Sequence, residues 1–216
     1  MTSGREALAQ GGPPAAADLR GFPVRRLSAG RAVYRAHGVG ASPWWYASGG
    51  TGRFDLPAPQ GTCYLADSAL VAVRERLGVV LGGSAEVPAG LFVGTVVSRL
   101  TLPAPAALAN LRSVAAARFG VLRELEVMVP YGVPRAWARA FATAGYDGIA
   151  YGARFTPRRA GSIACFGAAG GRETWPVDPQ PVSATAVPGA PRATPRPLLS
   201  HVKVIAPPRT GSRTDG

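Results

Sequence analysis

The chain has 216 residues, which is enough for one well-packed domain with additional segments at its ends but too few for two ordinary domains. A hydrophobic content of 47% with all aromatic residue types present excludes a wholly disordered protein. The formal net charge of +12 indicates an anionic partner. Because the arginines are scattered singly or in pairs rather than in a stripe, a basic pocket for a phosphorylated small molecule explains the charge as well as a nucleic-acid surface would.

The two ends of the chain differ in composition from its middle. Residues 1–21 are rich in Ala, Gly and Pro without a sustained period, and we predict a flexible segment there. Prolines recur every few residues in residues 171–216, so we expect a Pro-rich disordered tail in which only residues 198–205 have the pattern of an edge strand. A single domain is therefore expected over residues 22–170.

No segment has the pattern of a targeting or membrane sequence. The first residues lack the apolar core of a signal peptide, and no apolar run approaches the roughly 20 residues that a membrane helix needs. Cys63 and Cys165 lie in apolar runs without a second Cys or a paired His at metal-binding spacing. We therefore expect a soluble, cytoplasmic protein that does not contact a membrane, with two buried free thiols and no metal site.

Short strands and two helices are predicted in chain order. Segments rich in β-branched, aromatic or cysteine residues lie between turn residues at 32–36, 61–66, 91–97, 148–151 and 162–166. The first helix follows Asp67 or Ser68, either of which can cap it, and ends near Gly78. The second has Pro134 in its first turn and ends at Gly145. Strands and helices do not alternate regularly, so the fold class is α+β.

Two ordered groups of residues carry the functional information. Between residues 31 and 78 the chain contains a Tyr-Arg pair, two tryptophans, a Gly-Arg-Phe-Asp unit, the strand Gly-Thr-Cys-Tyr-Leu-Ala and a helical glutamate. A Trp-Ala pair on the second helix, the sequence YDGIAYGAR (146–154) and the sequence IACFG (163–167) follow. No Walker-type phosphate loop or Rossmann fingerprint occurs. As an ordered set, this series resembles the RES-domain family over residues 22–170.

The resemblance implies an ADP-ribosyltransferase-like mixed core of short strands with a few helices. It also implies NAD as the substrate, cleavage of its nicotinamide–ribose bond, and transfer of ADP-ribose to phosphate or water, as in NAD phosphorylases and NAD glycohydrolases, without a metal. Many members of the family are toxins that are silenced by an antitoxin with a DNA-binding helix-turn-helix domain. A partner of that kind, and a homo-oligomer, are therefore possible assemblies for this chain.

The resemblance assigns roles to three charged residues. Arg35 and Arg53 match the family arginines, which can clamp the pyrophosphate of NAD by forked hydrogen bonds. Glu75 matches the family glutamate, whose carboxylate can stabilise the positive charge that develops on the ribose, so Glu75 and Arg35 are the catalytic candidates. From the residues alone, both arginines can equally be solvated, and Glu75, between Arg74 and Arg76, can be a surface charge.

Aromatic residues are expected near the substrate because nicotinamide and adenine are flat rings that gain from stacking. Tyr34 and Tyr64 match family positions near the NAD pocket. Trp44 and Trp45 can form a wall or lid of the pocket or pack in the core. His37 can contact a substrate phosphate or lie at the edge of the core.

The chain departs from the family pattern at Ala153, where RES domains carry a serine that we count among the NAD-binding positions. Alanine makes no side-chain hydrogen bond, so the loss can cost about 1 kcal/mol of substrate binding. Ser162 lies nearby in sequence and can replace the missing hydroxyl in space. Two alternatives to the NAD-degrading enzyme follow: a protein ADP-ribosyltransferase, and a catalytically weakened module that binds a nucleotide or nucleic acid.

Overall fold

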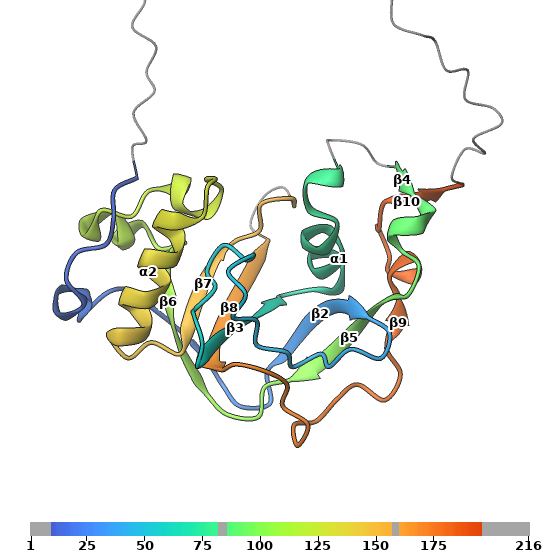
Figure 1. Cartoon of the computed structure of the whole chain (residues 1–216), viewed down its shortest axis with the longest axis horizontal. Helices are drawn as coiled ribbons and strands as arrows, with labels where there is room; N and C mark the ends of the chain where they lie inside the picture. Colours follow the sequence, from blue (N-terminus) through green and yellow to red (C-terminus); the bar gives the residue numbers. More distant parts are fainter. Residues whose placement is uncertain (1–9, 82–85, 157–159, 196–216) are drawn as a thin grey trace, which may run out of the picture.

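The computed structural model describes residues 10–81, 86–156 and 160–195 of the chain (Figure 1). Its centre is a mixed sheet of eight strands. In spatial order they are β1 (Val24–Leu27), β6 (Ala106–Asn110), β7 (Gly148–Gly152), β8 (Gly161–Ala168), β3 (Gln60–Ala66), β2 (Ala32–Gly38), β5 (Thr95–Thr101) and β9 (Val182–Ser183). Among the described strands of this sheet, only β6 and β7 pair in parallel. The predicted α+β class is confirmed.

The sheet separates into two halves between β2 and β3. β3 pairs with β8 along its whole length, and β2 pairs with β5 in the same way. In contrast, β2 and β3 pair only at Tyr34 and Ala66. Because a single residue pair joins the halves, the facing edges diverge beyond it, and side chains from both strands can line a pocket there.

Each half of the sheet has its own helix (Figure 1). The helix α1 (Ala69–Leu77) packs on β2, β3 and β5, and α2 (Gly132–Thr143) packs on β7. Ser68 caps α1 by accepting a hydrogen bond from the Val71 amide at 3.3 Å, and Gly78 ends it with a φ of 57°. Of the two predicted N-cap residues the structure uses Ser68, and the predicted end near Gly78 is confirmed. The helix α1 carries Glu75 toward the divide between the half-sheets.

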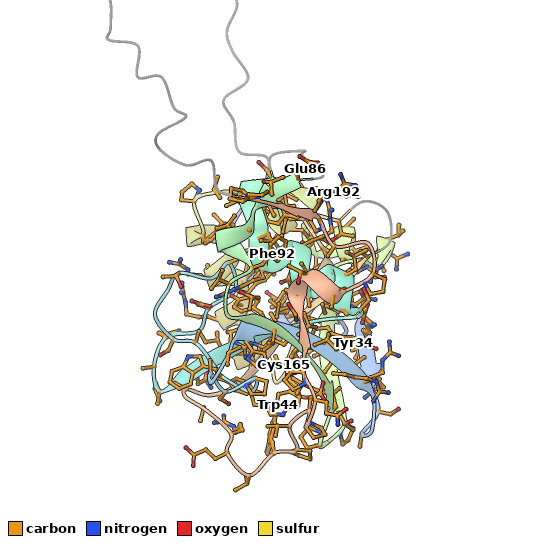
Figure 2. The ribbon with its side chains drawn as sticks, turned by 90° about the vertical axis from the view of Figure 1, so that its right-hand side faces the viewer. Tyr34, Trp44, Glu86, Phe92, Cys165 and Arg192 are labelled. Carbon is orange, nitrogen blue, oxygen red and sulfur yellow. The ribbon has the colours of Figure 1, made fainter. Side chains whose placement is uncertain are left out.

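A second hydrophobic cluster lies on the face of the sheet opposite the helices. It contains Trp44 from the loop after β2, Cys63 from β3 and Cys165 from β8. Trp44 and Cys63 are fully buried there with Leu100 and Ile163. Figure 2 shows Trp44 and Cys165 in the lower half of the view, far from Glu86 and Arg192 at the top. Glu86 and Arg192 form an ion pair of 3.7 Å that joins the short strands β4 (Glu86–Pro88) and β10 (Arg192–Thr194).

Ordered structure extends past the expected domain boundaries. At the amino end, the Gln10 amide side chain donates to the Gly120 carbonyl at 3.0 Å and accepts from the Leu122 amide at 2.7 Å, and Leu19 is fully buried. At the other end, β9 extends the sheet and Val187 is buried against α1 residues. These contacts are long-range, so local composition does not reveal them. Residues 1–9 and 196–216, with the predicted edge strand, lie outside the described residues.

Four of the five predicted strands are present as β2, β3, β7 and β8. The prediction for residues 91–97 was wrong at its start, because a 3-10 turn occupies Ala89–Leu91 and β5 begins only at Thr95. Strands β1 and β6 were not predicted, since both are short and β6 consists largely of alanine. No helix among the described residues has the length and apolar character that crossing a bilayer requires.

Candidate active site

A pocket of about 440 Å³ opens between β2, β3, α1 and the loops before β3 and after β7. Its volume falls within the range of small-molecule sites. Five of the six residues predicted to act on NAD line it: Tyr34, Arg35, Arg53, Tyr64 and Glu75. They come from two strands, one loop and one helix, so only the folded chain brings them together.

Arg35 projects from β2 and holds the loop that follows this strand. Its Nη1 donates to the Pro43 carbonyl at 2.8 Å, the Trp45 carbonyl at 2.9 Å and the Cys63 sulfur at 3.0 Å. Among the described residues, Nε and Nη2 have no hydrogen-bond partner. One side of the guanidinium is therefore fixed to the protein, and the other side can donate to an anion in the pocket.

Arg53 is buried rather than exposed in its loop. Its side chain is only 9% exposed, its Nη1 donates to the Met128 carbonyl at 2.5 Å, and its guanidinium lies 4.8 Å from the centre of the Tyr131 ring. Burial lowers the pKa of Arg53, but an arginine stays charged at neutral pH. A desolvated positive charge at the pocket wall favours an anionic ligand.

Glu75 faces Arg53 across the pocket rather than bulk water. Its Oε1 accepts a hydrogen bond from the Phe155 amide at 2.8 Å. Burial raises the pKa of Glu75, whereas the Phe155 amide and the charge of Arg53 oppose that rise. The neighbouring Arg74 secures the same segment, because its Nε donates to the Phe155 carbonyl at 2.7 Å. The carboxylate is thus fixed in a partly desolvated position.

The Tyr64 hydroxyl orders the loop that carries Arg53. It donates to Asp55 Oδ1 at 2.8 Å and accepts from the Phe54 amide at 2.9 Å, while Asp55 Oδ2 accepts from the Gly52 amide at 2.8 Å. Burial and the adjacent Asp55 carboxylate raise the pKa of Tyr64 far above its ordinary value, so the hydroxyl remains protonated. A Cβ at Gly52 would collide with Asp55 and the Tyr64 hydroxyl.

A second anchor of this loop comes from α2. Arg135 donates from Nε to the Gly52 carbonyl at 3.1 Å and from Nη2 to the Gly50 carbonyl. Its guanidinium also lies 5.7 Å from the centre of the Tyr131 ring. The loop is therefore held by β3 on one side and by α2 on the other.

Ala153 is the predicted site residue that the structure does not place in this pocket. It is 8% exposed, packs in the cluster around α1 and lines a different cavity. Ser162 on β8 lies opposite Tyr151 of β7, and both line the pocket. The Ser162 hydroxyl is buried and has no hydrogen-bond partner among the described residues, and burial raises the pKa of the neighbouring Tyr151 phenol. The Ser162 hydroxyl can thus bond to a ligand.

The other candidate residues lie outside the pocket. His37 is bonded to the Gly38 carbonyl at 2.9 Å and to the Ser98 hydroxyl at 2.8 Å. Trp44 is in the core, whereas Trp45 is 51% exposed. Cys63 and Cys165 are buried free thiols, as predicted. Within the described ranges, no three His, Cys, Asp or Glu side chains form a group that could hold a metal ion.

Sequence reasoning missed several pocket residues. Asp55, Tyr131, Arg154 and Phe155 line the pocket, yet none was assigned a role. The Gly-Arg-Phe-Asp unit contained the signal for Asp55, because a glycine three residues before an aspartate allows the aspartate to accept the glycine amide. Tyr131 gave no local signal, since it reaches Arg53 from a segment far along the chain.

These features define an α+β protein with a cationic pocket, lined also by the carboxylates of Asp55 and Glu75, at the divide of a split mixed sheet. A family model, the RES domain, matches residues 32–184. The chain belongs to the RES-domain family, and its mixed sheet with few helices agrees with the α+β fold expected from that resemblance.

One solved structure shares this fold at low sequence identity. A chain of the crystal structure of the M. tuberculosis MbcT–MbcA toxin–antitoxin complex is similar with a TM-score of 0.56 and 15% identity, over 70% of this chain and 80% of that chain. No curated protein sequence matches.

Proposed function

We propose that this protein degrades NAD by breaking the bond between nicotinamide and ribose, and that it passes ADP-ribose to phosphate or water. The observation that carries the proposal is the meeting of Glu75, Arg35 and Arg53 in one pocket of about 440 Å³. A carboxylate and two guanidiniums match the developing positive charge on the ribose and the two negative charges of the pyrophosphate.

The reaction needs one group to stabilise charge. As the glycosidic bond breaks, its electron pair goes to the nicotinamide nitrogen, which becomes neutral, and the ribose becomes oxocarbenium-like. The ionised Glu75 carboxylate, held by the Phe155 amide at 2.8 Å, stabilises that cation. Phosphate or water then attacks the anomeric carbon and loses a proton, which gives ADP-ribose phosphate or ADP-ribose.

The remaining residues position the substrate. Arg35 and Arg53 bind the pyrophosphate with the guanidinium nitrogens that the protein leaves available. Ser162 lines the same pocket, and its hydroxyl, which has no hydrogen-bond partner among the described residues, is a further group for binding the substrate. Tyr34 and Tyr131 provide aromatic surface for the rings of NAD.

We also propose that the protein is the toxin of a toxin–antitoxin pair. The RES-domain family and the similarity to a chain of the MbcT–MbcA complex support this assignment. An antitoxin, which we expect to carry a helix-turn-helix domain, would inhibit the enzyme by covering the cationic pocket. Expression of the chain alone should then stop bacterial growth, and Glu75→Gln should abolish that effect. Growth arrest by the variant would contradict a role based on NAD loss.

The direct test is release of nicotinamide from NAD by the purified full chain, with and without inorganic phosphate. Removal of the charge in Glu75→Gln should lower kcat about 100-fold or more, because interactions with a developing charge have effects of that order. Glu173→Gln is the matched control, since Glu173 is exposed and lies outside the pocket. No turnover by the unaltered chain in either condition would remove the proposal. ADP-ribose attached to protein instead would identify a transferase.

A further inference from the structure

A second cavity, separate from the proposed NAD site, lies where β6 and β7 end. It has a volume of about 700 Å³, and the proposed reaction uses none of its lining residues, which include Ala153 at the position of the family serine. Three arginines line it: Arg25 from β1, Arg112 from the segment after β6, and Arg123 from the 3-10 turn Arg123–Glu126. No arginine is shared with the first pocket.

The charges around this cavity do not balance. Arg25 contacts Asp67 at 2.9 Å, and Arg31 and Arg112 each lie 3.8 Å from the same carboxylate. Glu126 is the other acid, and it is buried with its Oε2 accepting from the Gly152 amide at 2.8 Å. Arg25, Arg112 and Arg123, which line the cavity, therefore face the carboxylates of Asp67 and Glu126, which leaves an excess of one positive charge, whereas Arg31 contacts Asp67 but does not line the cavity.

One guanidinium nitrogen has an unmet hydrogen bond. Arg25 Nη1 is buried and has no partner among the described residues, whereas its Nη2 bonds to Asp67. Pairing between β1 and β6 fixes the backbone of Arg25 opposite Leu108. Because a buried N–H without an acceptor is costly, a shift of this guanidinium toward an anion in the cavity would give Nη1 an acceptor that the described residues do not supply.

The backbone is shaped to bring the charged groups together. A Cβ at Gly161 would collide with both the Asp67 carboxylate and the Arg112 guanidinium, and a Cβ at Gly152 would collide with the Glu126 carboxylate. The ends of β7 and β8 thus pack directly against the acids that orient the arginines. This close approach distinguishes the cavity from a chance grouping of surface arginines.

We propose that the second cavity binds a small phosphate-bearing anion through Arg25, Arg112 and Arg123. Guanidinium groups match phosphate oxygens in geometry, and the excess of positive charge at the lining favours an anion. The arginines line a hollow rather than an extended stripe, which favours a small molecule over a nucleic-acid backbone. The proposal is independent of the proposed NAD chemistry.

The test is isothermal titration of the full chain with inorganic phosphate and, separately, with pyrophosphate. The double variant Arg112→Gln with Arg123→Gln should weaken binding about tenfold or more, because two charged donors are lost. Arg118→Gln removes a charge from the neighbouring 3-10 helix Val114–Phe119 without altering the cavity lining, and it should change the affinity by less than about twofold. Thermal unfolding checks that each variant is folded.

Arg25→Gln gives a second measurement, and it should weaken phosphate binding while leaving nicotinamide release unchanged. Arg53→Gln separates the two pockets, because binding in the second cavity should survive it. Three results would overturn the proposal: no saturable binding by the unaltered chain, binding lost in Arg53→Gln but retained in the double variant, or an equal loss in Arg118→Gln. Competition by duplex DNA at the same arginines would instead assign the surface to nucleic acid.

Discussion

At the scale of single residues, the environment of Glu75 sets the pH range in which the proposed reaction can operate. Burial raises the pKa of its carboxyl, and the Phe155 amide and Arg53 only partly offset that effect. The ionised form is the one that stabilises an oxocarbenium-like ribose. A carboxyl with a raised pKa loses this form at a higher pH than an ordinary glutamate does.

We therefore predict that kcat falls with decreasing pH around a midpoint above 4.5, the ordinary pKa of glutamate. The measurement is nicotinamide release from saturating NAD across the acid range. Circular dichroism at each pH ensures that the loss does not come from unfolding. A midpoint at or below the ordinary value, in a folded protein, would show that Glu75 is not the titrating group.

At the scale of elements, the loop that carries Arg53 depends on the absence of a side chain at Gly52. A Cβ there would collide with Asp55 and with the Tyr64 hydroxyl, two groups that hold the loop. We predict that Gly52→Ala lowers the free energy of unfolding by about 1–3 kcal/mol and weakens NAD binding. Urea denaturation and NAD titration measure the two effects. Gly49→Ala is the control, since nothing lies within 4 Å of its Cβ position.

The helix α2 contributes to the same loop through Arg135, a positioning residue that bonds to the Gly50 and Gly52 carbonyls. We predict that Arg135→Ala raises KM for NAD about tenfold while kcat changes less, because the loop loses its anchor but Glu75 is untouched. Arg139→Ala on the same helix is exposed and should leave both constants unchanged. A fall in kcat alone would contradict this role.

At the scale of the whole molecule, residues after the expected domain boundary complete the core. The Trp175 ring packs edge-on against Trp44 at 5.0 Å and Tyr46 at 6.2 Å, and the Trp44 indole donates to the Pro176 carbonyl at 2.8 Å. The segment therefore covers the face of the sheet opposite the helices, and it buries the loop that Arg35 holds.

We predict that Trp175→Ala lowers the free energy of unfolding by about 2 kcal/mol, because a large and partly buried aromatic contact is lost. Chemical denaturation monitored by far-UV circular dichroism measures the change. Val177→Ala, at a side chain that is 56% exposed, should have an effect within about 0.5 kcal/mol. Equal stability of Trp175→Ala and the unaltered chain would mean that this segment does not support the core.

Local signals in the sequence determined the fold class, the start of α1 after Asp67 or Ser68, its end at Gly78, and four strands, because periodicity and capping depend on neighbouring residues. The order of short motifs also determined the family, which the match over residues 32–184 confirms. The assignment of Arg35, Arg53 and Glu75 to one site followed from that resemblance and not from their spacing.

Tertiary structure alone decided how these residues are held. Arg53 is buried because Met128 and Tyr131 reach it from a distant segment, and Ser162 enters the pocket because β8 pairs with β7 opposite Tyr151. The ordered structure after residue 170 likewise depends on contacts with Trp44 and with α1. Long-range packing brings such groups together, and a local sequence pattern does not indicate which distant segment will pack against a given residue.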